Sequence, residues 1–193
     1  MPNDLAEVIR RLAAPDQSER ERAAREIFQR GVGLAHPVIE KWLADKELSA
    51  AYVPDASNSP KATVGIAVTP EHFAEIRAAW GSPRLAEVPP DQDAMEFELH
   101  SGHHTRLDIL TTAQPGGPGA IARFLQKSGE GIQQVELLVR DVDHATEILR
   151  TKYNLEPIYP QTRTGADKTR VNFFLVATPQ GKKVLIELVE PTR

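Results

Sequence analysis

Apolar residues in the first fifty positions recur at the spacing of amphipathic helices. The first helix is marked by four residues that share one face: Leu5, Val8, Ile9 and Leu12. Pro15 is expected to end it, and Gly31 to end a second helix that begins with a capping box at Ser18. A third helix is expected to open at Pro37. Because one such unit cannot bury its apolar face alone, these three short helices must pack on the rest of the chain or on a partner.

A stretch rich in Pro, Ser and Asn follows at residues 54–61, PDASNSPK. This composition is typical of a linker. It divides the chain into a helical N-terminal segment, 1–53, and a larger domain, 62–193.

The larger domain carries strands and helices in two similar rounds. Each round opens with an apolar strand, at 64–68 and 132–139, and continues with a helix, at 70–80 and 142–153. The other strands are expected near 84–88, 95–100 and 105–112 in the first round and near 156–159, 170–177 and 183–189 in the second. A short helix at 120–127 joins the rounds. The order βαβββ, occurring twice, predicts an α+β fold.

Composition excludes several classes of function. The 193 residues carry a net charge of -4, whereas nucleic-acid binding relies on a surplus of Lys and Arg. The chain contains no Cys, which excludes disulfides, thiolate metal sites and a cysteine nucleophile. It has no long apolar run and no signal-peptide pattern. We therefore expect a cytoplasmic protein that binds neither nucleic acid nor membrane.

Alternation along the expected strands places several polar residues on shared faces. These sets are Glu96, Glu98 and His100; Arg106 and Asp108; Gln134 and Glu136; and Leu185, Glu187 and Val189. Glu187 is the most informative, because its neighbours in sequence are Ile186 and Leu188. A carboxylate there is costly to bury unless it meets a cation, a hydrogen-bond donor or a proton. The alternative is an edge strand on which Glu187 faces water, and the sequence pattern alone favours neither.

Three histidines cluster at positions 100, 103 and 104 in the segment HSGHHT. Ser-Gly is turn chemistry, so we interpret His103 and His104 as exposed loop residues of a hairpin, with a metal site as the alternative. The other histidines lie at expected helix starts and are interpreted as structural: His36, His72 and His144.

Two segments of the larger domain carry a family pattern: residues 118–139, PGAIARFLQKSGEGIQQVELLV, and residues 184–191, VLIELVEP. They resemble the second half of methylmalonyl-CoA epimerases, which belong to the glyoxalase, or vicinal oxygen chelate, superfamily. The resemblance extends over 62–193. It implies that the two βαβββ modules form one curved mixed sheet around a cavity, and that the protein is a homodimer.

Members of this superfamily hold a divalent metal with two histidines, an amide or carboxylate, and a glutamate. By resemblance, Glu187 in VLIEL is that glutamate, and Asp108 in TRLDIL is the amide or carboxylate ligand. Both histidine positions hold other residues, Thr63 in ATVGIAV and Gln134 in GEGIQQ. The oxygens of Gln134, Asp108 and Glu187 would suit Mg²⁺, Mn²⁺ or Ca²⁺ better than Zn²⁺ or Co²⁺. The loss of both imidazoles favours a site without metal.

An epimerase of this family takes a proton from the carbon between a thioester and a carboxylate and returns it on the opposite face. The resemblance assigns this work to Glu187 and to Glu96 in MEFEL, with Glu98 as the alternative register. Arg170, after the Gly-rich segment TRTGADK, would meet the phosphates of an acyl-CoA, unless this is an ordinary hairpin with solvated charges.

Two functions therefore stay open. The first is an isomerase or lyase that transfers a proton next to a carbonyl, with Gln134 and Asp108 positioning a cation or the substrate, an acyl-CoA or another carboxylate. The second is a non-catalytic module that binds a small molecule. In that case Thr63 and Gln134 would hydrogen-bond Asp108 and Glu187 in a polar pocket without metal, and the N-terminal helices would recruit a partner or control access.

Overall fold

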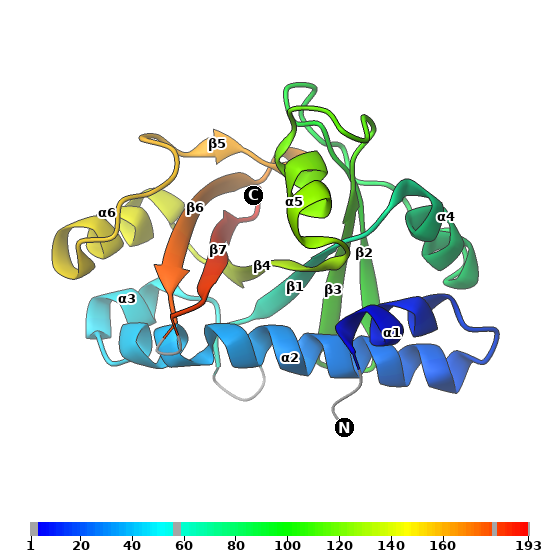
Figure 1. The fold of residues 1–193 in the computed structure, drawn as a ribbon. Helices are drawn as coiled ribbons and strands as arrows, with labels where there is room; N and C mark the ends of the chain where they lie inside the picture. The colour runs from blue at the N-terminus through cyan, green and yellow to red at the C-terminus, as the bar shows by residue number, and fades with distance from the viewer. Residues whose placement is uncertain (1–3, 56–58, 179–180, 193) are drawn as a thin grey trace. The chain divides into compact units, whose positions relative to one another are not determined.

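The computed structural model describes residues 4–55, 59–178 and 181–192. The chain divides into two compact units: Met1–Gly31 with Thr63–Gln133, and Val32–Ala62 with Gln134–Arg193. Each unit therefore combines part of the N-terminal helical segment with one of the two strand-rich modules (Figure 1). The predicted linker at 54–61 lies within the second unit, and the division into a segment 1–53 and a domain 62–193 stays a prediction.

The helical part of the first unit consists of α1 (Leu5–Arg10), the 3-10 turn η1 (Arg11–Ala13) and the first half of α2 (Gln17–Leu43). Asp4 caps α1 by accepting a hydrogen bond from the backbone N–H of Ala6 at 3.4 Å. Of the expected apolar face of the first helix, Val8, Ile9 and Leu12 are fully inaccessible and Leu5 is partly buried. In α2, Ala23, Ala24 and Ile27 are also fully inaccessible.

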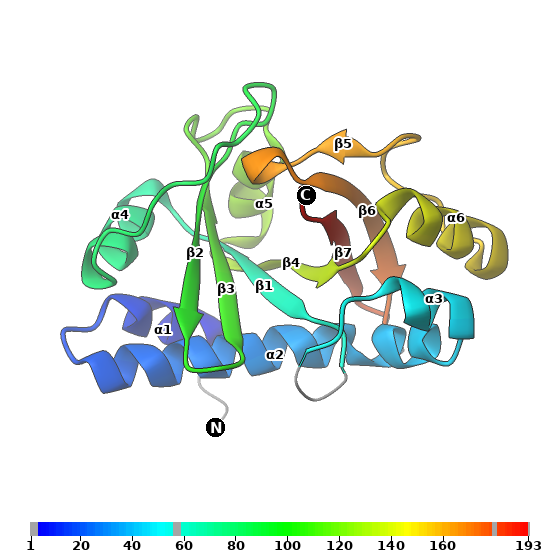
Figure 2. The same cartoon turned by 180° about the vertical axis from the view of Figure 1, so that it is seen from behind.

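Three strands form the sheet of the first unit: β1 (Ala62–Ala67), β2 (Met95–Ser101) and β3 (Thr105–Thr111), in the order β2-β3-β1. β1 is parallel to β3, whereas β2 and β3 form an antiparallel hairpin, seen from behind in Figure 2. The predicted hairpin around the histidine cluster is thereby confirmed.

Two helices complete the first unit, α4 (Pro70–Ala79) and α5 (Ala120–Ser128). The ring of Phe73 in α4 meets that of Phe97 in β2 edge to face, with 4.9 Å between centroids. Just after α4, Nε1 of Trp80 donates to the carbonyl oxygen of Leu12 at 2.9 Å. At this contact, the N-terminal helices therefore pack on the first module of the same chain and not on a partner.

Gly31 does not end a helix, because α2 continues through both Gly31 and Pro37. The prediction that one helix stops and another starts here is wrong, although residues 4–53 as described do contain three α-helices. A Cβ atom on Gly31 would lie 2.4 Å from Cγ1 of Val64 and 2.6 Å from its Cγ2. Glycine is therefore needed for the helix backbone to approach β1, and not for a left-handed cap.

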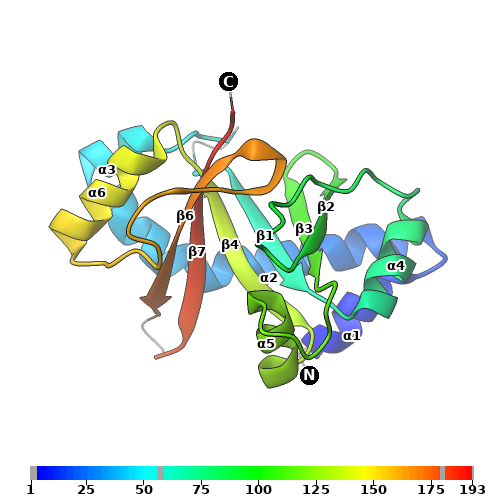
Figure 3. The ribbon, with the colours of Figure 1, turned by 90° about the horizontal axis from the view of Figure 1, so that it is seen from above.

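The second unit contains the rest of α2, α3 (Lys46–Ala51) and α6 (Val142–Tyr153). α6 lies against β6 and β7, and α3 lies against α6 (Figure 3). The strands are β4 (Gly131–Leu138), which belongs to this unit from Gln134 onward, β5 (Arg163–Thr164), β6 (Arg170–Ala177) and β7 (Lys183–Glu190), with the turn η2 (Ala166–Lys168) before β6.

These strands follow the order β4-β7-β6-β5. β4 and β7 are parallel, and β6 is antiparallel to both of its neighbours. The buried apolar core of this unit includes Trp42, Leu48, Leu149, Phe174 and Ile186. Each unit is therefore a mixed sheet covered by helices, which confirms the α+β class.

Two expected strands, near 84–88 and 156–159, do not form among the described residues. The backbone N–H of Ala86 donates to the carbonyl of Glu96 at 3.0 Å, and that of Ile158 donates to the carbonyl of Phe173 at 2.8 Å. Pro83 and Pro89 flank the first segment, and Pro157 lies within the second with Pro160 directly after it; since proline cannot donate to a ladder, regular pairing stops there.

In the predicted linker, a hydrogen bond joins the two residues on either side of its undescribed part: the backbone N–H of Asp55 donates to the carbonyl oxygen of Ser59 at 2.7 Å. Its residues 56–58 lie outside the described part of the chain. Within that described part, no helix has the length and apolar character needed to cross a membrane.

Candidate functional site

Glu187 lies at the centre of a polar group on one face of the second unit. Its Cα partners are Glu136 in the parallel strand β4 and Phe173 in the antiparallel strand β6. The neighbours Val135 and Ile186 point to the opposite face, into the apolar core. Glu187 is buried, with 8% of its surface exposed, so the alternative that it faces water does not hold.

Gln134 supplies the donor that a buried carboxylate requires. Its Nε2 donates to Oε2 of Glu187 at 2.5 Å and to Oε1 of Glu136 at 3.1 Å. Since an amide nitrogen has two N–H groups, it can serve both carboxylates at once. Gln134 is itself buried, whereas Glu136 is partly accessible to solvent. One amide therefore contacts two carboxylates, of which Glu187 is buried and Glu136 is partly accessible.

An aromatic surface borders this polar group. The ring of Tyr159 lies 6.0 Å from that of Phe173, edge to face, and the guanidinium of Arg163 lies 4.5 Å above the Tyr159 ring. The sequence did not single out these residues, because the register that sets Phe173 beside Glu187 is not readable from alternation alone. They provide an apolar surface beside the buried carboxylate of Glu187.

The donor set fits a divalent metal poorly. Gln134 presents its nitrogen to Glu187, and only its oxygen could ligate a metal. Across residues 4–55, 59–178 and 181–192, no three His, Cys, Asp or Glu side chains are grouped so as to hold an ion. Gln134 and Glu187 are brought together as the resemblance implies, but by a hydrogen bond.

The other predicted site residues of the first unit share one face of its sheet. Thr63 precedes Val64 in β1, and the register pairs Gly65 with Asp108 and Asp108 with Glu98. Glu96 lies two pairs further along, opposite Leu110, and therefore on the same face. Asp108 is buried, with 6% of its surface exposed, and Thr63 and Glu96 are partly buried. Thr63, Asp108 and Glu96 thus belong to one unit, and Gln134 and Glu187 to the other.

Arg170 is not on the face of Glu187. It opens β6 three residues before Phe173, with its side chain on the opposite side of the strand. Its guanidinium pairs with Asp143 at the start of α6 and with Oε2 of Glu190 at 3.2 Å. The hydrogen bond from Arg170 lowers the pKa of Asp143. Two carboxylates therefore already accompany the residue proposed to meet phosphates.

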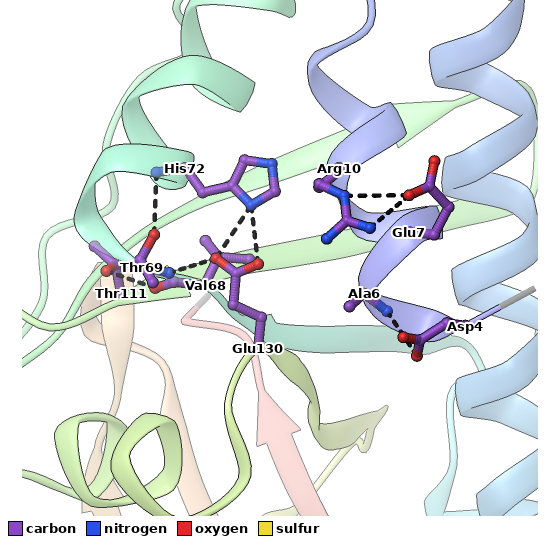
Figure 4. A network of polar contacts seen from close by, with 9 residues as sticks. All are labelled: Asp4, Ala6, Glu7, Arg10, Val68, Thr69, His72, Thr111 and Glu130. Atoms are coloured by element: carbon purple, nitrogen blue, oxygen red, sulfur yellow. Dashed lines mark hydrogen bonds and ion pairs between the residues drawn. The ribbon is translucent and has the colours of Figure 1, made fainter.

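His72 has a partner that the sequence did not indicate. Its Nδ1 lies 3.0 Å from Oε2 of Glu130, in the segment before β4, and Glu130 also accepts from the backbone N–H of Thr69 at 2.9 Å (Figure 4). This hydrogen bond raises the pKa of His72, although burial opposes it. Burial alone would raise the pKa of Glu130, but the bonds from His72 and Thr69 outweigh it and lower the pKa. The interpretation of His72 as structural now has a physical basis.

The histidines of the hairpin lie as the turn chemistry predicts. His103 and His104 are exposed in the turn, with 6.4 Å between their ring centroids. His100 is also exposed, and its Nε2 lies 2.9 Å from Oε2 of Glu98. Glu98 thus has an exposed histidine partner on its own strand.

Solved structures match the chain, whereas no protein-family model and no curated protein sequence does. A methylmalonyl-CoA epimerase from Mycobacterium tuberculosis is similar over 68% of this chain and 87% of its own, with 33% sequence identity and a TM-score of 0.54. A variant of the Streptomyces coelicolor methylmalonyl-CoA epimerase in complex with 2-nitronate-propionyl-CoA covers 69% of this chain and 98% of its own, at 23% identity and a TM-score of 0.54. A methylmalonyl-CoA epimerase in complex with methylmalonyl-CoA and NH4+ covers 69% and 94%, at 24% identity and a TM-score of 0.54. The last two similarities support the fold alone.

Proposed function

Because the chain belongs to the methylmalonyl-CoA epimerase family of the glyoxalase superfamily, we propose that it is an isomerase or lyase that transfers a proton at a carbon next to a carbonyl. Glu187 is the proposed base. The observation that carries the proposal is the 2.5 Å contact between Oε2 of Glu187 and Nε2 of Gln134, with both side chains buried.

Burial and the amide contact each serve the proposed chemistry. Burial keeps bulk water away from the reacting carboxylate, and the amide fixes the direction in which Glu187 points. When Glu187 takes the proton, its oxygen no longer needs the N–H of Gln134. That N–H can then donate to the enolate oxygen as negative charge develops there. Gln134 would thus do part of the work that a cation does in metal-dependent relatives.

The proposal routes no step through a metal. Mg²⁺, Mn²⁺, Ca²⁺ or Co²⁺ held by Gln134, Asp108 and Glu187 would require the amide to turn its oxygen toward the ion and to give up both carboxylate contacts. We therefore propose that the protein works without a resident metal.

The proposed ligand is an acyl-CoA or another thioester. Two of the similar epimerases are complexes with such molecules, 2-nitronate-propionyl-CoA and methylmalonyl-CoA. The aromatic pair Tyr159 and Phe173 offers an apolar contact for an acyl group beside Glu187. Arg170 stays a candidate for a phosphate contact, in competition with Asp143 and Glu190.

Solvent exchange tests the proposed activity. The protein is incubated in D2O with a panel of acyl-CoA thioesters, and deuterium at the carbon next to the thioester is followed by NMR or mass spectrometry. Incorporation well above the buffer rate is the expected result. If no acyl-CoA of the panel exchanges above buffer, the proton-transfer function is rejected.

The second candidate is a module that binds a small molecule without changing it. The observation that favours it is the same amide, which donates to both carboxylates and so provides a polar site that needs no metal. Calorimetry on the same acyl-CoA panel separates the two candidates. Saturable binding without deuterium exchange supports the module, whereas binding with exchange supports the enzyme.

The remaining expectations from the sequence are also proposals. Glu96 is the second base by resemblance, and Thr63 and Asp108 contact the substrate. The protein is also proposed to be cytoplasmic and to form a homodimer. Light scattering on the purified chain tests the oligomeric state directly.

A further inference from the structure

Arg163 lies on the same face of the second unit as Glu187, with strand β6 between them. The Cα partner of Arg163 in β6 is Val171, and Val171 and Phe173 alternate onto the same side of that strand. Phe173 is in turn the Cα partner of Glu187 in β7. Arg163 and Glu187 therefore project from one face of the sheet, whereas Arg170 projects from the other.

The guanidinium of Arg163 is held against two aromatic rings that lead toward the buried carboxylate. It lies 4.5 Å from the centroid of the Tyr159 ring, which lies 6.0 Å from that of Phe173. The buried side chain of Asn172 fixes the backbone below, since its Nδ2 donates to the carbonyl oxygen of Tyr159 at 3.3 Å. A stacked guanidinium that is already placed loses little freedom when it binds a ligand.

Contacts on the other side of the sheet hold the short strand that carries Arg163. The hydroxyl of Thr162 donates to Oδ1 of Asp143 at 2.9 Å and accepts from Nη2 of Arg170 at 3.1 Å. Arg170 also pairs with Asp143 and with Glu190. Arg170 therefore positions this segment, and Arg163 presents its positive charge on the opposite face.

The Glu187 face carries two carboxyl groups, those of Glu187 and Glu136, which share the amide of Gln134. An anionic ligand is repelled by carboxylates of the protein unless a cation offsets their charge. A guanidinium meets this need, because its planar fork bonds a carboxylate with two N–H groups at once. It has five N–H donors in all, so that contacts with protein groups leave donors for a ligand.

We propose that Arg163 binds the free carboxylate of the substrate and so selects thioesters of dicarboxylic acids over those of simple acids. This inference rests on the proposed acyl-CoA ligand and adds a residue that determines specificity. Adjacent strands lie about 4.8 Å apart, so β5 and β7 lie about 10 Å apart across β6. An acyl group over Phe173 then has Glu187 on one side and Arg163 on the other. The phosphates of CoA are at the far end of its pantetheine arm, so the carboxylate is the anion nearest the reacting carbon.

Binding of a matched pair of ligands tests the inference. Methylmalonyl-CoA and the methyl ester of its free carboxyl group share the coenzyme and the acyl carbons and differ in charge. Isothermal titration calorimetry on the full-length protein measures both dissociation constants. The wild type is expected to bind the acid at least about 10-fold more tightly than the ester. Arg163→Gln is expected to weaken binding of the acid alone by about 10- to 100-fold, the usual loss for a hydrogen bond to a charged group.

Two further variants serve as controls. Lys183→Gln removes a positive charge from the exposed start of β7, on the same face and four residues from Glu187, and should leave the preference unchanged. Arg163→Lys keeps the charge without the planar fork and is expected to lose part of the preference. Circular dichroism and thermal melts establish that each variant is folded. If Arg163→Gln is not, a full wild-type preference in Arg163→Lys overturns the inference.

The outcomes separate this inference from the proton-transfer function, which deuterium exchange into methylmalonyl-CoA measures. The inference is overturned, and proton transfer left standing, by a preference that is absent from the wild type, kept in Arg163→Gln or lost equally in Lys183→Gln. Equal weakening of acid and ester in Arg163→Gln also overturns it, because Arg163 would then meet the phosphates of the coenzyme. A preference lost only in Arg163→Gln, without exchange by the wild type, supports the inference and rejects proton transfer. No binding of either ligand rejects both the inference and the acyl-CoA ligand.

Discussion

His72 and Glu130 join two parts of the first unit that are far apart in sequence. The imidazole Nδ1 lies within 3.1 Å of both carboxylate oxygens. Thr69, directly before α4, bonds the same carboxylate through its backbone N–H. The first turn of α4 is therefore held to the segment that leads into β4 and Gln134.

This pair should make stability depend on pH in a defined direction. The pKa of His72 is raised above 6.5, so its contribution is complete below pH 6.5 and is lost as pH rises through the raised value. The pKa of Glu130 is lowered below 4.5, so its contribution is complete above pH 4.5 and is lost as pH falls through the lowered value. The pair stabilises the fold most between these limits. Arg10 opposes the charge on His72, and Glu75 supports it.

We expect His72→Gln to reduce the free energy of unfolding by about 1 kcal/mol more at about pH 5.5 than at about pH 9. Urea denaturation of the wild type and the variant at both pH values measures the difference. A cost of substitution that is the same at both would show that the charge of His72 does not contribute.

The approach of α2 to β1 predicts a costly glycine substitution. In Gly31→Ala the new methyl group would overlap Val64, a fully buried, branched side chain. Overpacking of this kind costs about 1–3 kcal/mol, more than the roughly 1 kcal/mol that Ala gains over Gly in a helix. We expect a net loss of stability in thermal or urea unfolding.

Gly33 provides the matched control, because a Cβ there meets nothing within 4 Å in the same helix. Gly33→Ala should be neutral or stabilise by up to about 1 kcal/mol. In a Val64→Ala background, Gly31→Ala should lose most of its destabilising effect. A double-mutant cycle measures this coupling between the two positions. Equal gains from both glycine substitutions would mean that α2 does not approach β1 this closely.

Metal should have little effect on the folded protein. If Gln134 holds Glu187 through its nitrogen, neither EDTA nor millimolar Mg²⁺, Mn²⁺ or Ca²⁺ should shift the melting temperature, since a bound ligand would raise it by mass action. Differential scanning fluorimetry measures this. A saturable rise that disappears in Glu187→Gln would contradict the proposed donor set and restore the metal site.

The fold could be predicted from sequence to the extent that periodicity reports local structure. Strand alternation placed Gln134 with Glu136, and Glu187 opposite its apolar neighbours, as the structure has them. It could not set β4 beside β7 in a register that pairs Glu136 with Glu187, because their contact spans about fifty residues. Glu136 was therefore visible on the correct face but without its partner.

Gly31 and His72 show why other features were missed. A glycine near the end of an apolar stripe indicates a cap by local chemistry, and only the packing against Val64 reveals the other reason for it. The partner of His72 lies 58 residues away, beyond any local pattern. The two segments predicted as strands do not form strands for a local reason that the sequence does contain, namely the prolines within and beside them.

The rate of deuterium incorporation by Glu187→Gln, compared with the wild type on an acyl-CoA that the wild type exchanges, tests the central claim most directly. The substitution keeps the shape of the side chain and removes its capacity to accept a proton. With Glu187 as the buried base held by Gln134, exchange should fall by about 100-fold or more while the variant stays folded. Exchange at the wild-type rate in a folded Glu187→Gln protein would contradict the account.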